Sequence, residues 1–274
     1  MDSKEIVDGV IKKIEAMIYN KDNISVVDVA NMSGYSKRHI QKIFKIFTGM
    51  NISTYIRKRK LTQAAILLKL TKKKIYHIAM ELNFSTQQSF TRAFLREFNV
   101  TPLEYRNESG FDCTGLFLGV SINLYIKSPV MKVIDSLKLN TKEFHYRDSL
   151  LGKPYSRSNN IRLQEVTSIL SAKNEAVIVT TFDPSSYKTE INLVAMIGYS
   201  DATNYNYETY SGCYWELEYN GTWEEYIIFG RFFILFIDFK IDLFIIECIQ
   251  LNGKARDGQQ LYCVKVYLPT PHNG

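Results

Sequence analysis

The sequence is short of the residues on which many catalytic and metal sites depend. Its four histidines are scattered, its four cysteines form no C-x-x-C pair, and it has neither a G-x-S-x-G nor an H-E-x-x-H motif. These absences exclude hydrolases and zinc peptidases of those motif types. Isolated cysteines favour reduced, buried thiols over a disulfide framework or a zinc site. We therefore expect no enzyme, no cofactor and no bound metal.

Long apolar runs are also missing. The most apolar stretch, Tyr226 to Ile237, is too short to span a bilayer and contains Arg231. The first residues, Met1 to Glu5, carry charge where a signal peptide needs an apolar core. The sequence therefore predicts a cytoplasmic protein with no membrane partner, associated with the nucleoid if it binds DNA.

What the chain does have is an uneven distribution of charge. Residues 1–107 hold 19 Lys and Arg against 9 Asp and Glu, a balance of +10, whereas residues 108–274 hold 15 against 19, a balance of −4. With 274 residues, 46% of them hydrophobic, the chain is long enough to bury two cores. This predicts a basic domain that faces a polyanion and a second domain with a different task.

The basic half contains the same pattern twice. Residues 29–36 (VANMSGYS) are echoed by residues 78–85 (IAMELNFS). In each copy a short helix leads into a turn whose central residue, Gly34 or Asn83, tolerates a left-handed backbone, and a second helix follows. Helix, turn, helix is the unit that places its second helix in a DNA major groove. Two copies in register make the signal specific.

Each second helix has an apolar side for anchoring and a polar side that suits DNA. Ile40 and Phe44 anchor the first helix, and Phe90 and Phe94 anchor the second. The opposite sides and their margins carry Arg38, Gln41, Lys42, Lys45, Gln87, Gln88, Thr91, Arg92 and Arg96. Arginine and lysine reach O6 and N7 of guanine, and glutamine bridges N6 and N7 of adenine. The repeated pattern favours base reading over a merely solvated surface.

A long helix, about Asn51 to Leu70, is predicted between the two units. At ~1.5 Å per residue it would span roughly 30 Å. Successive major-groove faces on one side of a duplex lie ~34 Å apart. One monomer could therefore read two adjacent grooves. The basic runs at 57–60 and 72–74 would lie either near phosphates or in solvent, and both interpretations stay open.

Most of residues 5–106 resembles the AraC/XylS family of transcription regulators, in the branch of MarA, SoxS and Rob. The segments that carry the resemblance are Gly34 to Lys37, Tyr55 to Arg57, Ser85 to Phe94 and Thr101 to Arg106. It implies an all-helical domain of seven helices with two recognition helices. It also implies a regulator, expected to be an activator, that binds asymmetric double-stranded promoter DNA and recruits RNA polymerase.

The resemblance also assigns roles to individual positions. The base-reading residues it implies are Arg38, Gln41, Lys42, Gln87, Gln88, Ser89, Thr91 and Arg92. Arg38 and Lys42 depart from the branch, which usually has Trp and Arg there. The sequence preference of the first half-site therefore does not carry over from the branch, whereas the second helix follows it.

After residue 107 the pattern changes. A loose connection at 108–128 is followed by the order strand, helix, strand, strand, which occurs twice. The expected helices are near 161–172 and 223–239, and the expected strands are at 176–182, 191–198, 212–219, 243–249 and 261–268. The chain is thus predicted to be multi-domain. An all-α double helix-turn-helix domain at 1–107 and a linker at 108–128 precede an α+β domain of two βαββ halves at 129–274.

The end of the chain resembles the GyrI-like effector domain, which Rob carries after its AraC-type half. The resemblance rests on residues 212–221 and on Tyr262 to Pro269. It implies a regulatory domain with an aromatic groove between two halves. The residues predicted to bind an effector are Trp215, Tyr219, Trp223, Tyr226 and Lys265. The family often has an acid for cationic ligands where this chain has Lys265, so the resemblance predicts an anionic or neutral amphiphile, or no small ligand.

Two roles for the second domain stay open. The aromatic groove favours a sensor of a small amphiphilic effector. The apolar helix expected at 226–239 favours instead a protein-interaction or dimerisation module without a small ligand. We expect a monomer on DNA, with a dimer through the C-terminal domain as the alternative.

Overall fold

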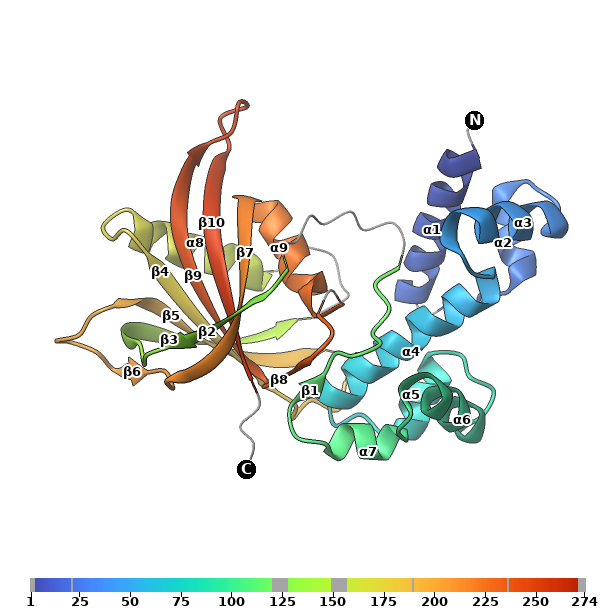
Figure 1. Cartoon of the computed structure of the whole chain (residues 1–274), viewed down its shortest axis with the longest axis horizontal. Helices are drawn as coiled ribbons and strands as arrows, with labels where there is room; N and C mark the ends of the chain where they lie inside the picture. Colours follow the sequence, from blue (N-terminus) through green and yellow to red (C-terminus); the bar gives the residue numbers. More distant parts are fainter. Residues whose placement is uncertain are drawn as a thin grey trace. The chain divides into compact units, whose positions relative to one another are not determined.

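The computed structural model of the chain describes residues 3–20, 22–119, 128–148, 157–188, 190–235 and 237–270 (Figure 1). Residue contacts group the chain into two compact units. Unit 1 comprises Met1–Lys69, Lys73–Asn107 and Gly115–Asn123, and unit 2 comprises Leu70–Lys72, Glu108–Thr114 and Leu124–Gly274. Within the described ranges, no helix is both long enough and apolar enough to cross a membrane.

Unit 1 is helical. Its helices, in the described residues, are α1 (Ser3–Asn20), α2 (Val26–Ser33), α3 (Lys37–Thr48), α4 (Ile52–Leu70), α5 (Ile75–Glu81), α6 (Gln87–Phe98) and α7 (Pro102–Asn107). Helices α1 to α3 form one group, α5 to α7 form another, and α4 runs between the two groups (Figure 1). The long central helix is confirmed within one residue of its predicted start.

The helix starts and cores of unit 1 follow from local sequence. The apolar stripe of α1, which includes Val7, Ile11 and Ile14, is buried and packs on α2 and α3. Ser25 begins α2 in a capping box with Asp28. The hydrogen bonds from Ser25 lower the pKa of the Asp28 carboxyl below its ordinary value.

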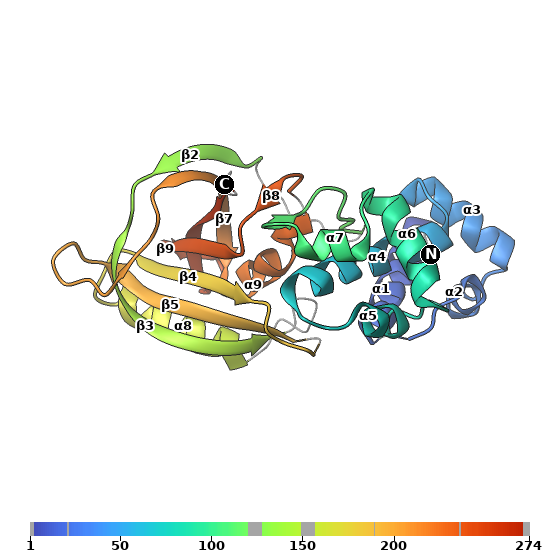
Figure 2. The same cartoon turned by 90° about the horizontal axis from the view of Figure 1, so that it is seen from below.

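Unit 2 is built on a curled antiparallel sheet with helices on one face (Figure 2). The sheet strands are β2 (Val130–Ile134), β3 (Lys138–Asp148), β4 (Ala176–Asp183), β5 (Ile191–Ser200), β6 (Tyr207–Glu208), β7 (Gly212–Thr222), β9 (Phe244–Lys254) and β10 (Gln260–Pro269). Their spatial order is β2-β7-β10-β9-β4-β5-β3-β6. The helices are α8 (Arg157–Leu170) and α9 (Trp223–Phe232), which continues as the 3-10 turn η1 (Phe233–Leu235).

The order strand, helix, strand, strand occurs twice in unit 2, as the sequence predicted. One copy is β3-α8-β4-β5 and the other is β7-α9-β9-β10. In space the first copy reads β4-β5-β3 and the second reads β9-β10-β7, and β4 pairs with β9 antiparallel. The two copies are therefore equivalent halves joined at the centre of one sheet. Their helices lie side by side on that sheet, which leaves a groove between them.

Some elements of unit 2 differ from the expectation. The second helix ends at Phe232 rather than near 239, and the chain continues through η1 to β8 (Lys240–Ile241). Its apolar residues, Tyr226, Ile227 and Phe229 among them, are buried in their own unit. Strands β2, β3 and β6 had no predicted counterpart. In β3 the buried positions are Leu139, Thr141 and Tyr146, and the adjacent charged residues Lys142 and Glu143 interrupt the spacing, so the strand lacks a clear apolar alternation.

The described part of the predicted linker contains ordered contacts. Strand β1 (Phe111–Asp112) pairs with β8 in unit 2. Phe117 packs within unit 1: its amide donates to the Thr62 hydroxyl at 2.8 Å, and its carbonyl accepts from Arg59 at 2.6 Å. Its ring meets the ring of Tyr55 edge-on at 5.4 Å between centroids. The rest of the predicted linker, residues 120–127, lies outside the described residues.

Candidate nucleic-acid interface and effector pocket

Two helix-turn-helix units of the same construction lie in unit 1. In the first, Gly34 has a φ of 71°, and Ser36 caps α3 by accepting a hydrogen bond at 3.3 Å from the amide three residues on. In the second, Asn83 has a φ of 59°, and Thr86 caps α6 in the same way at 3.0 Å. Both turns are left-handed, which confirms the correspondence between glycine and asparagine drawn from the sequence.

The inner side of each second helix is apolar and completely buried. Ile40 and Phe44 of α3 and Phe90 and Phe94 of α6 are all 0% exposed. The Phe94 ring also contacts the Phe98 ring, with 4.6 Å between their centroids. These contacts fix the rotation of each helix about its axis, so the residues on the other side face away from the core.

The predicted DNA-binding residues lie on the outer side and its margins. Exposed among them are Arg38, Lys42, Lys45, Gln87, Gln88, Arg92 and Arg96, and half-buried are Gln41, Ser89 and Thr91. The Ser89 hydroxyl is already engaged in the cap of α6, since it donates to the Thr86 carbonyl at 2.8 Å and accepts from the Thr86 amide at 3.2 Å. A base contact by Ser89 would have to compete with these bonds.

The outer sides of both helices are positive. Helix α3 contains no acidic residue, and the one acid in α6, Glu97, forms an ion pair with Lys58 of α4. The Arg92 side chain lies along its own helix, where its Nε donates to the Gln88 carbonyl at 3.4 Å. Uncompensated positive charge of this kind attracts the phosphate backbone, while the glutamines and arginines can reach base edges.

The basic runs behave differently from both interpretations offered by the sequence. Arg59 is only 6% exposed and forms two hydrogen bonds of 2.8 Å to Glu15. Lys60 is also buried, and burial lowers the pKa of its ammonium group. Lys73 forms an ion pair with Glu81. These residues stabilise unit 1 and face neither phosphates nor open solvent. The members of the two runs that stay exposed are Arg57, Lys72 and Lys74.

Comparison with known proteins agrees with this geometry. A family model described as a helix-turn-helix domain matches residues 29–108. YkgA of Escherichia coli (strain K12), an HTH-type transcriptional regulator by its name, is 32% identical over 170 residues, which cover 61% of this chain and 71% of YkgA. The chain belongs to the AraC/XylS family. Within that family its relatives are regulators of the MarA/SoxS/Rob branch, so this AraC-type protein is a sequence-specific DNA-binding transcription regulator and not an enzyme.

The comparisons cover the two units unequally. The transcriptional regulator Rob of Salmonella typhimurium (strain LT2) is 44% identical, but over 93 residues that cover 34% of this chain and 32% of Rob. A solved AraC-type DNA-binding regulator from Chromobacterium violaceum is 31% identical and covers 38% of this chain and 91% of its own, with a TM-score of 0.35. The match to Rob is no longer than unit 1, so it does not extend the AraC-type assignment to unit 2.

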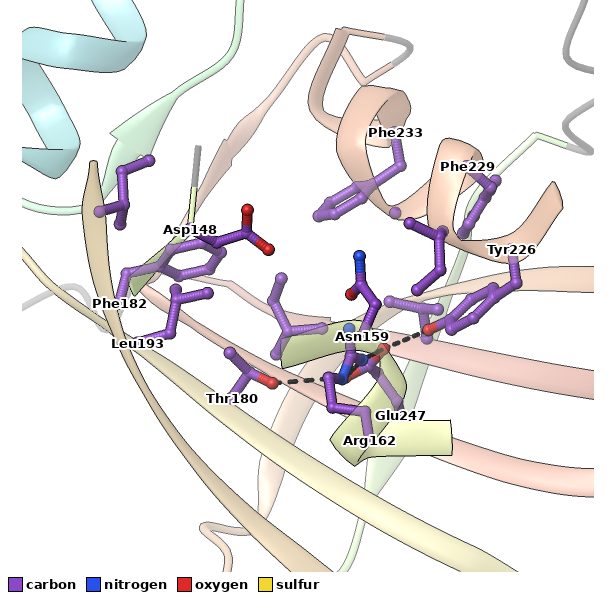
Figure 3. Close-up of a pocket in the computed structure, with 15 residues that line it drawn as sticks. Asp148, Asn159, Arg162, Thr180, Phe182, Leu193, Tyr226, Phe229, Phe233 and Glu247 are labelled. Atoms are coloured by element: carbon purple, nitrogen blue, oxygen red, sulfur yellow. Dashed lines mark hydrogen bonds and ion pairs between the residues drawn. The ribbon is translucent and has the colours of Figure 1, made fainter. Parts of the chain in front are cut away.

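Unit 2 of this AraC-type regulator holds a pocket between α8, α9 and the sheet (Figure 3). Its empty volume is about 710 Å³, including its open mouth. Apolar side chains form most of the wall: Phe182, Ile191, Leu193, Ile227, Phe229, Phe233, Ile245 and Val266. Polar side chains from both helices and from the sheet also line it: Asp148, Asn159, Arg162, Thr180, Tyr226 and Glu247.

The predicted effector residues are distributed around this pocket. Tyr226 lines it, and Trp223 and Tyr219 pack against Tyr226 with ring centroids 5.6 Å and 5.4 Å away. Trp215 does not line it and stacks on Phe239 instead. Lys265 does not line it either: it is exposed on the face of β10 opposite to the pocket-lining Val266. Lys265 therefore gives no reason to exclude a cationic ligand from this pocket.

Three charged pocket residues were missed by the sequence interpretation, and one of them had a visible signal. Glu247 stands alone in the apolar strand Phe244 to Ile249, and a buried acid requires a partner. The partner is Arg162 of α8, whose terminal nitrogen donates to both carboxylate oxygens at 2.7 and 2.8 Å. The third, Asp148 at the end of β3, accepts a hydrogen bond from Ser158 at 2.9 Å.

The buried network shifts the protonation equilibria of its members. Burial raises the pKa of the Tyr226 hydroxyl well above its ordinary value, and the negative charge of Glu247 adds to the effect. Burial by itself would lower the pKa of Arg162, but the Glu247 carboxylate together with Tyr226 and Tyr146 outweighs it, and the net direction is upward. Tyr226 is thus a neutral donor and Arg162 a permanent cation at the floor of the pocket.

Proposed function

We propose that the protein is a transcription activator that inserts α3 and α6 into adjacent major grooves of promoter DNA. The observation that carries the proposal is the pair of equally built, equally anchored recognition helices with positive outer sides. Helix α4 has 19 residues and spans ~28 Å. This length suits the ~34 Å separation of successive major-groove faces. RNA polymerase is the partner that such an activator would recruit.

Roles within the interface follow from residue type and exposure. Arg38 and Lys42 of α3 and Gln88 and Arg92 of α6 are placed to read base edges. Arg57 belongs to the set of exposed cations placed to contact phosphates, which position the protein without reading sequence.

The test is a fluorescence-anisotropy titration of the full chain against a pooled promoter library and a scrambled duplex, at two salt concentrations. We expect preferential binding to selected library members that persists at the higher salt, with a protected footprint of about 20 base pairs from two adjacent half-sites. Equal binding to both DNAs that disappears with salt would reduce the interaction to phosphate attraction and contradict the proposal.

A pair of variants tests the base-reading role directly. Arg92→Ala should weaken binding to the selected site by ~1–3 kcal/mol and relax the preference at one base position. The matched control is Lys12→Ala, which removes an exposed positive charge from α1, outside both recognition helices. It should leave the preference intact. Unchanged preference in Arg92→Ala would refute the assignment of α6.

For unit 2 we propose a GyrI-like regulatory role in which a small molecule binds in the pocket and tunes the regulator. Two equivalent βαββ halves with a mostly apolar groove between their helices support this role. The alternative, a dimerisation module using the apolar second helix, has less support because most of the described apolar residues of α9 and η1 are buried in their own unit.

A further inference from the structure

We propose that the pocket of unit 2 takes an uncharged, largely apolar molecule and discriminates against organic cations and anions. The inference rests on the proposed sensing role of this pocket and adds the class of ligand. Three observations carry it: the one deeply buried acid is fully bonded within the protein, the charges that remain disfavour an anion, and the walls are apolar.

The acid at the floor of the pocket has no bonding capacity left for a ligand. Glu247 is 6% exposed and accepts two hydrogen bonds from Arg162, one from Tyr226 and one from Thr180 at 3.4 Å. A carboxylate offers about four acceptor positions, so these bonds saturate it. Its charge is matched by the guanidinium. An organic cation could bind the Glu247 carboxylate only by displacing Arg162, which would leave a buried guanidinium without its counter-ion.

An anion is opposed by the remaining charges. The charged side chains that line the pocket are Asp148, Arg162 and Glu247, one cation against two carboxylates. Arg162 is already committed to Glu247, and its guanidinium carbon lies 5.9 Å from the centre of the Trp223 ring. The buried Nε of Arg162 has no hydrogen-bond partner among the described residues, so the arginine keeps some donor capacity, but a ligand carboxylate or sulfonate would enter a site whose lining is already net negative. Asp148 is half-buried and bonded to Ser158, so it offers a cation only a screened partner.

The walls and one helix position suit an apolar occupant. Phe182 and Leu193 from the sheet, Phe229 from α9 and Phe233 from η1 face the same space (Figure 3). Gly230 of α9 also lines it, and a Cβ built there would meet no atom within 4 Å. A glycine inside a helix costs ~0.5–1 kcal/mol relative to alanine. Here it leaves open space beside the aromatic rings.

The test uses three probes with one skeleton and the full-length protein. They are N-phenyl-1-naphthylamine, which is neutral, its 8-sulfonate, which is an anion, and the same naphthylamine carrying a quaternary trimethylammonium group. Each brightens in an apolar site, so dissociation constants follow from fluorescence titration. We expect the neutral probe to bind at least ~10-fold more tightly than either charged analogue, because a charge buried without a partner costs several kcal/mol.

A blocking variant assigns the binding to this pocket. Gly230→Leu places a side chain in the open space without a backbone clash and should abolish binding of the neutral probe, while circular dichroism and thermal unfolding show that the fold is kept. Gly9→Leu, on α1 of unit 1, is the matched control, since its Cβ also meets no atom within 4 Å. It should leave probe binding unchanged.

Two charge variants should reverse the preference. Glu247→Gln leaves Arg162 without its counter-ion and should raise the relative affinity for the sulfonate by about tenfold or more. Arg162→Gln leaves Glu247 uncompensated and should do the same for the trimethylammonium probe. If either variant fails to fold, the ranking of the three probes on the unmodified protein still decides the inference.

The possible outcomes distinguish the inference about ligand charge from the proposal that this pocket senses a small molecule. If the trimethylammonium or sulfonate probe binds best and Gly230→Leu removes that binding, the pocket is a small-molecule site and the inference about charge is wrong. If no probe binds, or Gly230→Leu has no effect on binding, the sensing role of this pocket fails and the inference fails with it. Neither result touches DNA recognition by unit 1, which the promoter titration measures independently.

Discussion

Each unit contains a buried arginine–glutamate pair, and the two pairs are built in opposite ways. In unit 1, the side chain of Arg59 is 6% exposed and that of Glu15 is 26% exposed. Arg59 donates two hydrogen bonds to the Glu15 carboxylate. In unit 2 the acid is the deeper member: the side chain of Glu247 is 8% exposed and that of Arg162 is 18% exposed. The first pair ties α4 to α1, whereas the second lies beside a cavity.

The comparison shows that burial alone does not tell a structural pair from a functional one. A further guanidinium nitrogen of Arg59 donates to the Phe117 carbonyl, and the Glu15 carboxylate also accepts from Tyr55, so these bonds join separate segments of the protein. The Arg162 pair also binds Tyr226, but it faces open volume, where we propose that it disfavours charged ligands. The role of such a pair therefore depends on whether protein segments or a cavity surround it.

The largest expected effect comes from replacing Arg162, the partner of the more deeply buried acid Glu247. Arg162→Met should lower the free energy of unfolding of unit 2 by ~3–5 kcal/mol, because it leaves Glu247 charged and almost inaccessible to water. Replacing both residues, in Arg162→Met/Glu247→Leu, should recover most of the loss. Denaturant titration followed by tryptophan fluorescence reports unit 2, since both tryptophans lie there. A double variant as unstable as the single one would contradict this account.

The matching change in unit 1 should cost less. Arg59→Met also removes a guanidinium from a carboxylate, but Glu15 is about a quarter exposed, so water can solvate the charge that remains. We expect ~1–3 kcal/mol, the cost of losing hydrogen bonds to a charged group. Circular dichroism, which follows the helices of unit 1, measures it. If Arg59→Met proved more destabilising than Arg162→Met, the contrast between the two pairs would not hold.

Helix caps offer a smaller and more local comparison. Both α6 and α9 begin with a capping box, formed by Thr86 and Ser89 in one and by Thr222 and Glu225 in the other. Thr86→Ala and Thr222→Ala should each cost ~1 kcal/mol. Amide hydrogen exchange should show loss of protection in α6 only for the first variant and in α9 only for the second. Thr86→Ala alone should also weaken specific DNA binding, because it loosens a recognition helix.

The smallest effect concerns thiol reactivity and needs no mutation. Burial, with a contribution from the charge of Glu175, raises the pKa of Cys248 to about 12, and burial raises the pKa of Cys113 as well. A raised thiol pKa means less thiolate at pH 8, so both should resist N-ethylmaleimide. Cys213 is exposed and should react first. Peptide mass spectrometry after brief labelling checks the order, and prompt labelling of Cys248 would show that unit 2 opens readily.

Much of unit 1 could be predicted because its elements are local. Helix periodicity, the left-handed turns at Gly34 and Asn83, and the caps at Ser25 and Ser36 all depend on residues within a few positions of each other. The anchors of each recognition helix follow from the same periodicity. The side of each helix opposite its buried anchors is then exposed, and it carries the candidate DNA-reading residues.

The pocket of unit 2 could not be predicted in the same way. Arg162 and Glu247 are 85 positions apart, and only the pairing of β9 with β4 and the packing of α8 on the sheet bring them together. Lys265 was placed in the groove by the resemblance to the GyrI-like domain, but strand alternation turns it to the other face. A one-residue difference in register moves a side chain from one face of a sheet to the other.

The sequence by itself therefore determined a double helix-turn-helix regulator of the AraC type, and it predicted which residues form the recognition surface. It also predicted the order strand, helix, strand, strand in both halves of a second domain, without residue ranges for β2, β3 or β6. Only the tertiary structure decided that Arg59 and Lys60 are buried rather than facing phosphate, and that Arg162 neutralises Glu247 beside a cavity. The physical reason is that helix signals act within a few residues, whereas the burial of a charge depends on which distant segments supply its partner.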